Sequence, residues 1–300
     1  MSYINDLHRD EIRSGWLVTA DAKKVWNRSL EIWAEVDRIC RKHNITYWAA
    51  GGTLIGAVRH NGFIPWDDDI DLWVTRPDFN RFVAVLKDEL AGTVFEVKKN
   101  FLSLVQISHS QTTRIDDTYF DGTPQGISLA VIALDIFDDG TPEGFTAINA
   151  LCESYIATYN YSALEDISRH GGQLFNDLAF LKTVSEIPDN ADKVKFFWIF
   201  AEQLFKQSDA ISSFEVMLNN AAKPFRKEWF AETIYLPFET VELPVPKMFD
   251  EVLTAYFGDW RTPVKFDQQH MGYIHSADIP WREFLQRVDV KKLLPPDEEA

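Results

Sequence analysis

The chain has 300 residues, of which 46% are hydrophobic and 14% aromatic, and this content argues against a disordered protein. Its formal net charge of −16 repels polyanions, so nucleic acid and an anionic bilayer surface are poor default partners. An acidic protein that handles phosphate therefore needs a metal ion or local basic residues.

The two cysteines, Cys40 and Cys152, lie in separate helix-like stretches and form no C-x-x-C pair. This pattern does not fit a zinc knuckle or a disulfide scaffold, and it indicates buried free thiols in a reducing cytoplasm. The charged N-terminus does not fit a signal peptide, and no uncharged apolar run approaches the roughly 18 residues of a membrane span. We therefore expect a cytoplasmic protein with, at most, peripheral membrane association.

Helices and strands are predicted in mixed order up to about residue 140. The spacing of apolar residues predicts a helix from 20 to 43, a buried strand at 45–50, a short helix at 54–60 after Gly51-Gly52-Thr53, and a turn at Asn61-Gly62. A strand at 69–74, a helix at 76–91 and strands at 94–97, 104–108, 113–119 and 128–137 follow. The strand at 128–137 is apolar on both faces, as expected for the centre of a sheet.

The pattern changes near residue 144, where three helix-like stretches begin, at 145–161, 174–187 and 192–220. Prolines limit 234–245 to a hairpin or edge strands, and 248–257 is predicted as a helix that ends at Gly258. We predict an N-terminal arm (1–20), an α+β catalytic core with a mixed sheet flanked by helices (21–140), and a mostly helical region (141–300) whose short β elements pack back on the core.

Four aspartates, Asp67, Asp68, Asp69 and Asp71, precede the apolar segment Leu72-Trp73-Val74. On a strand, Asp69 and Asp71 project from the same face. Their mutual repulsion favours a hard divalent cation such as Mg²⁺, which commonly takes one or two carboxylates and completes its shell with water and substrate phosphate. The alternatives are a solvated acidic loop or a calcium site without a catalytic role, and the apolar segment argues against a free loop. Asp67 and Asp68 are expected to support this pair.

The triplet Gly51-Gly52-Thr53 lies between a predicted strand and a predicted helix. A glycine pair there lets the backbone approach a ligand closely and leaves helix N–H groups available to an anion. Thr53 can cap the helix or donate to a phosphate oxygen. An ordinary tight turn is the commoner explanation for an isolated triplet, but the acidic cluster that follows favours phosphate binding.

Asp135 is the best candidate for a third carboxylate. It lies within A-V-I-A-L-D-I-F, where an unpaired charge is costly. If this strand lies beside the strand at 69–74, Asp135 can reach the same metal or take a proton from an attacking hydroxyl. A hydrogen-bonded structural aspartate is an equal alternative.

The stretch from residue 51 to 71, G-G-T-L-I-G-A-V-R-H-N-G-F-I-P-W-D-D-D-I-D, closely resembles the signature of the LicD family. Its members include phosphorylcholine transferases and, more distantly, fukutin-type ribitol-phosphate transferases. The segments K-K-V-W…I-C-R-K-H-N-I, L-P-F-E-T-V-E-L-P-V-P and Y-F-G-D-W-R-T-P also resemble the family's pattern. One departure is Asp138, where the family commonly has a proline after D-I-F.

The resemblance implies a nucleotidyltransferase-like fold and a transferase that depends on Mg²⁺, with Mn²⁺ as an alternative. A CDP-linked donor such as CDP-choline would bind, a hydroxyl of a glycan, lipopolysaccharide or teichoic acid precursor would attack the phosphorus attached to the alcohol, and CMP would leave. The residues expected to serve this site are Asp69, Asp71 and Asp135 as catalytic metal ligands, Gly51, Gly52, Thr53 and Arg59 for the nucleotide or phosphate, and, on weaker grounds, His60 and Glu239 for substrate positioning, with His270 weaker still.

Structural roles are the alternatives for His60, as part of a helix C-terminal pair with Arg59, and for Glu239. Two other functions also stay open. A nucleotidyltransferase that moves NMP from an NTP would use the same metal triad. A non-catalytic nucleotide-binding protein on this fold would need a broken carboxylate set, and all three positions are intact in this sequence.

Overall fold

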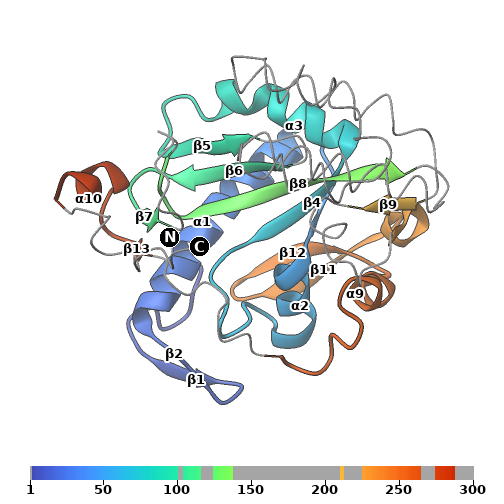
Figure 1. Ribbon diagram of the computed structural model, residues 1–300, viewed down its shortest axis with the longest axis horizontal. Helices are drawn as coiled ribbons and strands as arrows, with labels where there is room; N and C mark the ends of the chain where they lie inside the picture. The colour runs from blue at the N-terminus through green and yellow to red at the C-terminus, as the bar shows by residue number, and fades with distance from the viewer. Residues whose placement is uncertain are drawn as a thin grey trace, which may run out of the picture.

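The computed structural model describes residues 2–100, 104–115, 124–137, 210–212, 225–264 and 274–287. Most of the helical stretches expected between 145 and 220 lie outside these residues, as do Asp138, Cys152 and His270. Within the helix expected at 192–220, however, the described residues Ala210–Ser212 form a strand, so the prediction is wrong there. A mixed sheet lies at the centre (Figure 1), as the sequence predicted. Among the described helices, none combines the length and the apolar character that crossing a bilayer requires. The domain boundaries stay a prediction.

Strand β8 (Ser128–Phe137) is the spine of this sheet. It pairs in parallel with β4 (Asp71–Thr75) and, in antiparallel fashion, first with β6 (Leu104–His109) and then with β9 (Ala210–Ser212). The outer pairs are antiparallel: β3 (Tyr47–Ala49) on β4, β5 (Phe95–Asn100) on β6, and β10 (Phe225–Arg226) on β9. Every side chain of β8 from Ser128 to Leu134 is buried, which explains its unbroken apolar sequence.

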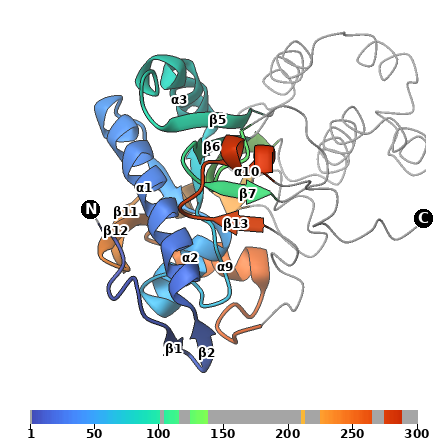
Figure 2. The same cartoon turned by 90° about the vertical axis from the view of Figure 1, so that its left-hand side faces the viewer.

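Helices α1 (Ala20–Lys42) and α3 (Arg76–Glu89) lie to one side of strands β5 and β6 (Figure 2). Helix α1 begins where the Thr19 hydroxyl accepts a hydrogen bond from the Ala22 N–H at 3.1 Å. Its apolar stripe, which includes Trp26 and Leu30, is fully buried. The chain then turns at Asn44, whose φ is +51°.

The N-terminal arm contains a hairpin that the sequence did not predict. Strands β1 (Glu11–Arg13) and β2 (Trp16–Val18) are joined by Ser14 and Gly15, both with positive φ, as a two-residue hairpin turn requires. This hairpin projects from the body at the bottom of Figure 1. Three-residue strands are too short for their alternation to stand out in a sequence.

The C-terminal part adds small elements around this core. A 3₁₀ turn (Lys227–Phe230) leads into the predicted hairpin, β11 (Thr233–Phe238) and β12 (Val241–Pro246), and α9 (Phe249–Phe257) ends at Gly258 as expected. Strand β13 (Ile274–Ser276) pairs with β7 (Thr113–Ile115), and α10 (Trp281–Arg287) follows. A second ribbon, β7–β13, therefore joins segments far apart in the sequence.

Candidate active site

The Gly-Gly-Thr triplet forms the first turn of α2 (Gly51–His60), so the helix begins three residues earlier than predicted. Gly51 has a φ of +46° and open space where a side chain would be. At Gly52, an added Cβ would lie 2.6 Å from Asp67 Oδ2, a distance too short for any side chain without movement of the carboxylate. The absence of a side chain at Gly52 is thus what lets a carboxylate lie against the start of α2.

The Thr53 hydroxyl ties this turn to the beginning of β4. Thr53 is buried, and its Oγ1 accepts a hydrogen bond from the Asp71 N–H at 2.9 Å. In turn, the Ala50 N–H donates to the Asp71 carbonyl at 2.9 Å. Both main-chain groups of Asp71 are therefore held by residues at the N-terminus of α2.

Asp67, Asp68 and Asp69 each direct a carboxylate oxygen to one place, and these oxygens lie within 4.8 Å of one another. Strand β4 begins at Asp71, so Asp69 lies just before it. Among the described residues, Asp71 lies outside this three-carboxylate group. The cluster is thus formed by consecutive residues of the loop between α2 and β4.

Asp135 lies on β8, beside β4 as expected, but the register separates it from the cluster. Asp71 pairs with Ala130 and Thr75 with Leu134, so Asp135 lies beyond the C-terminal end of β4. Asp135 is five positions beyond Ala130, which is about 16 Å along a strand. The structure therefore does not bring Asp135 to Asp69 and Asp71, and the expected triad is not formed by this register.

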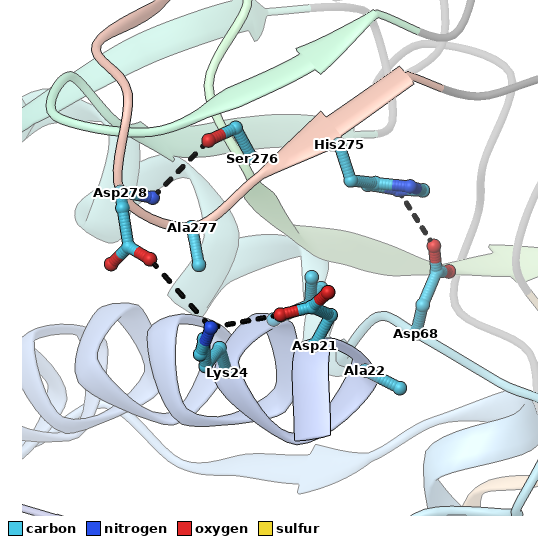
Figure 3. A pocket seen from close by; sticks show the side chains of 9 residues that line it. Asp21, Ala22, Lys24, Asp68, His275, Ser276, Ala277 and Asp278 are labelled. Carbon is cyan, nitrogen blue, oxygen red and sulfur yellow. Dashed lines mark hydrogen bonds and ion pairs between the residues drawn. The ribbon is translucent and has the colours of Figure 1, made fainter. Parts of the chain in front are cut away.

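The ribbon β7–β13 supplies two nitrogen-bearing side chains that face the cluster. Arg114 and His275 are directly opposite each other in this pairing. Arg114 Nη2 lies 3.5 Å from Asp69 Oδ2 and 3.8 Å from Asp68 Oδ1. His275 Nε2 lies 2.9 Å from Asp68 Oδ2 (Figure 3). Neither residue stands out in the sequence, because no local pattern shows that these two strands pair.

A cavity of about 410 Å³ adjoins the cluster on the side of Asp68. His275 and the three residues after it line one wall, and the first turn of α1 lines the other (Figure 3). Lys24 lies between two acidic groups of this rim, 2.8 Å from Asp21 and 4.0 Å from Asp278. The cavity thus offers charged groups of both signs next to the carboxylates.

Arg59 and His60 form a pair at the C-terminus of α2. Arg59 donates to the Trp260 carbonyl at 2.7 Å and, through Nε, to His60 Nε2 at 2.9 Å. Burial lowers the pKa of Arg59. It also lowers the pKa of His60 to about 4, with the charges of Arg59 and Arg13 adding to the effect. His60 is therefore neutral at pH 7, which matches its role as the acceptor in this pair.

Glu239 lies in the turn between β11 and β12, with a side chain that is 5% exposed. Its carboxylate forms an ion pair with Arg13 and accepts a hydrogen bond from the Phe63 N–H at 3.2 Å. These contacts join the β11–β12 turn to the N-terminal hairpin and to the loop after α2. The substrate-positioning roles expected for His60 and Glu239 therefore stay predictions.

The donor set fits a hard divalent cation. Three carboxylates converge, and the glycine at 52 leaves room for one of them against the backbone. Oxygen ligands of this kind suit Mg²⁺, Mn²⁺ or Ca²⁺ rather than a soft metal. Arg114 adds positive charge close to the same oxygens, and the His275 imidazole lies against Asp68.

Residues 44–125 match the family described as LicD/FKTN/FKRP, nucleotidyltransferase domain. The lipopolysaccharide cholinephosphotransferase LicD of Haemophilus influenzae is 28% identical over 248 residues, which cover 80% of this chain and 91% of that protein. The ribitol 5-phosphate transferase FKRP of Homo sapiens is 50% identical over 52 residues, 17% of this chain and 10% of that protein. The chain is thus similar to a cholinephosphotransferase over most of its length, and its residues 44–125 match the LicD/FKTN/FKRP nucleotidyltransferase domain.

Proposed function

We propose that this chain transfers phosphocholine, or a related phospho-alcohol, from a CDP-activated donor to a hydroxyl of a cell-surface glycan such as lipopolysaccharide, and that CMP is released. The observation that supports it most is the similarity to the Haemophilus influenzae cholinephosphotransferase across most of both chains. The shorter match to a ribitol 5-phosphate transferase supports a phospho-alcohol as the transferred group and leaves room for an alcohol other than choline.

Asp67, Asp68 and Asp69 are the residues that we propose to hold Mg²⁺. A bound ion would neutralise negative charge on the phosphoryl group during transfer. Asp71 was expected to share this role, and its main chain is fixed by Thr53 and Ala50 at the edge of the cluster. Asp135 is not included, because the β4–β8 register holds it at the other end of β4.

The donor pyrophosphate is proposed to lie at the N-terminus of α2, where the space beside Gly51 is open and helix N–H groups favour an anion. Arg114 and His275 are placed to donate hydrogen bonds to phosphate oxygens that approach the cluster. The acceptor oxygen then forms a bond to phosphorus as the bond to the CMP oxygen breaks. The contribution of the chain is alignment of these groups and stabilisation of their charge.

The experiment is a donor panel with purified protein and Mg²⁺: CDP-choline, CDP-ribitol, CDP-ethanolamine and the four NTPs, each with a glycan acceptor. We expect CMP release from a CDP-alcohol, with loss of at least about two orders of magnitude in Asp68→Asn and Asp69→Asn. Asp88→Asn, an exposed carboxylate on α3, is the matched control and should retain full activity. Pyrophosphate release from an NTP would instead indicate NMP transfer, and nucleotide binding without turnover would indicate a non-catalytic protein.

A cytoplasmic location, expected from the sequence, is part of this proposal. It agrees with a donor that carries a nucleotide. Fractionation of cells that express the chain with an epitope tag, followed by detection in cytosol and membrane fractions, would decide between a cytosolic and a membrane-attached enzyme.

A further inference from the structure

The loop between α2 and β4, residues 61–70, carries the acidic cluster, and Glu239 holds its beginning. The Glu239 N–H donates to the Asn61 carbonyl at 2.9 Å, and the Glu239 carboxylate accepts from the Phe63 N–H at 3.2 Å. The backbone of Glu239 has a φ of +54°, an uncommon value for a residue other than glycine. The two bonds bracket Gly62, where an added Cβ would overlap the Glu239 carboxylate.

Arg13, from the N-terminal hairpin, fixes the carboxylate of Glu239. The two terminal nitrogens of its guanidinium bind the two carboxylate oxygens, Nη1 to Oε1 and Nη2 to Oε2, the second at 3.0 Å. Such a two-point contact restricts the carboxylate more than a single bond does. Burial alone would lower the pKa of Arg13, but Glu239 and Glu11 outweigh it and the pKa is raised, so the guanidinium stays charged.

Trp26 holds the other end of the same loop. It is fully buried, and its indole N–H donates to the Asp67 carbonyl at 2.7 Å. Its ring stacks on Phe63 with 4.8 Å between the ring centres, and the Arg13 guanidinium lies 5.1 Å from the centre of the Trp26 ring. Phe63 and Asp67 are thus both bound to one connected group of buried side chains from β1, α1 and the β11–β12 turn.

We propose that Glu239 is a positioning residue for the metal site: together with Arg13 and Trp26 it fixes residues 63–67 at both ends, and so sets where Asp67, Asp68 and Asp69 present their carboxylates. This inference rests on the proposed function insofar as the cluster binds a divalent cation. Glu239 acts through the loop in this proposal, because its carboxylate is 5% exposed and Arg13 engages both of its oxygens.

The position of the carboxylates matters because Mg²⁺ and Mn²⁺ require metal–oxygen distances within a few tenths of an ångström of their ideal values. A loop released at Phe63 or Asp67 can still bring three carboxylates near one another, but it no longer holds them in one arrangement. The expected consequence is weaker metal binding with the same ligands present. Residues that support metal ligands in this way commonly change affinity by about 10–100-fold.

Two variants test the two anchors, with Mn²⁺ as the probe and the full chain as the sample. Glu239→Gln keeps an acceptor for the Phe63 N–H but removes the charge that Arg13 binds. Trp26→Phe keeps a ring to stack on Phe63 but removes the N–H that binds Asp67. Free Mn²⁺ is measured by electron paramagnetic resonance, and the melting temperature is measured in parallel. We expect each variant to bind Mn²⁺ at least about tenfold more weakly than the parent chain.

Glu89→Gln is the matched control. Glu89 is 9% exposed and binds Arg38, Lys42 and His43 near the C-termini of α1 and α3, so its loss also removes a charge from a well-bonded group. We expect this variant to melt at a lower temperature and to bind Mn²⁺ as the parent does. A melting-temperature loss in Glu239→Gln comparable to that in the control, with unchanged Mn²⁺ affinity, would overturn the positioning role.

Gly62→Ala provides a second route if Glu239→Gln does not fold, because the new methyl group presses on the Glu239 carboxylate from the loop side. Weaker Mn²⁺ binding in this variant supports the proposal, and parent-like binding opposes it. The two proposals fail in distinguishable ways. A parent chain that binds Mn²⁺ but releases no CMP contradicts the proposed reaction alone, whereas a parent chain that binds no Mn²⁺ contradicts both.

Discussion

Replacement of Gly52 by alanine places one methyl group against the acidic cluster without straining the backbone. Gly52 is helical and is not among the glycines with positive φ, so alanine suits its conformation. The new Cβ would lie 2.6 Å from Asp67 Oδ2, whereas ordinary contact begins at 3.4 Å. The carboxylate must therefore move by about 0.8 Å, the difference between these two distances, for unstrained contact.

This movement predicts weaker metal binding with little change in stability. Alanine in place of a helical glycine stabilises a fold by about 0.5–1 kcal/mol, which offsets the cost of shifting one side chain. Metal–oxygen distances, by contrast, tolerate only about 0.2 Å, so a displacement of about 0.8 Å removes or weakens a ligand. We expect Mn²⁺ affinity to fall about 10–100-fold, or about 1.4–2.7 kcal/mol, with little change in melting temperature.

The assay pairs Mn²⁺ titration with thermal unfolding followed by circular dichroism. Gly92→Ala is the control: Gly92 has a φ of +74° and open space around it, so alanine strains the backbone there without touching another group. The control should melt at a lower temperature and bind Mn²⁺ normally. Unchanged Mn²⁺ affinity in Gly52→Ala would refute the assignment of Asp67 as a ligand.

Three further predictions concern groups outside the cluster. Burial, with nearby arginines, lowers the pKa of His60 from 6.5 to about 4, so the stability of the fold should fall as the pH drops between these values. In His60→Gln the melting temperature should depend less on pH over this interval. Hydrogen bonds from Lys42 and His43 lower the pKa of Glu89 from 4.5 to about 2, so the stability that ionised Glu89 contributes to the fold should be lost as the pH falls from 4.5 to 2. Glu89→Gln should be less stable at neutral pH and should lose less stability than the parent over this pH interval. Burial raises the pKa of the Cys40 thiol, so iodoacetamide should modify Cys40 only after unfolding, as mapped by mass spectrometry.

A specific result would contradict each of the predictions on His60, Glu89 and Cys40. A parent protein whose melting temperature does not change between pH 6.5 and 4 would contradict the burial of a neutral His60. Parallel acid-unfolding curves for Glu89→Gln and the parent would show that Glu89 is equally stabilised in the unfolded chain. Rapid alkylation of Cys40 in the folded protein would show that α1 opens locally at its C-terminal end.

Local patterns in the sequence predicted most of the elements because they depend on near neighbours. The apolar run of β8 and the stripe of α1 arise from side chains that face one core, and their bounds were predicted almost to the residue. The start of α2 was placed three residues late, because Gly51 enters the helix with a positive φ that no helix pattern indicates. The adjacency of β4 and β8, which was a condition for Asp135 to reach the metal, is present in the structure.

The parts of the site that depend on pairing between distant segments could not be predicted in this way. Periodicity shows which face of a strand is buried but does not fix its register against a neighbour, and a shift of a few residues decides whether Asp135 reaches the cluster. Arg114 and His275 were missed for the same reason, since only the β7–β13 pairing brings them together. The dense aspartates of the loop, in contrast, stand out in the sequence by themselves.

The pairing of β7 with β13 has a consequence for the order in which the site forms during synthesis. Arg114 is made well before His275, and its strand has no β13 to pair with until the ribosome has added residues 274–276. Until then, the carboxylates of Asp68 and Asp69 repel one another without the imidazole of His275 against Asp68. The growing chain can therefore form α1, α2 and α3 and pair β4 with β8 early, while the surroundings of its acidic loop are finished only after residues 274–276 have been added.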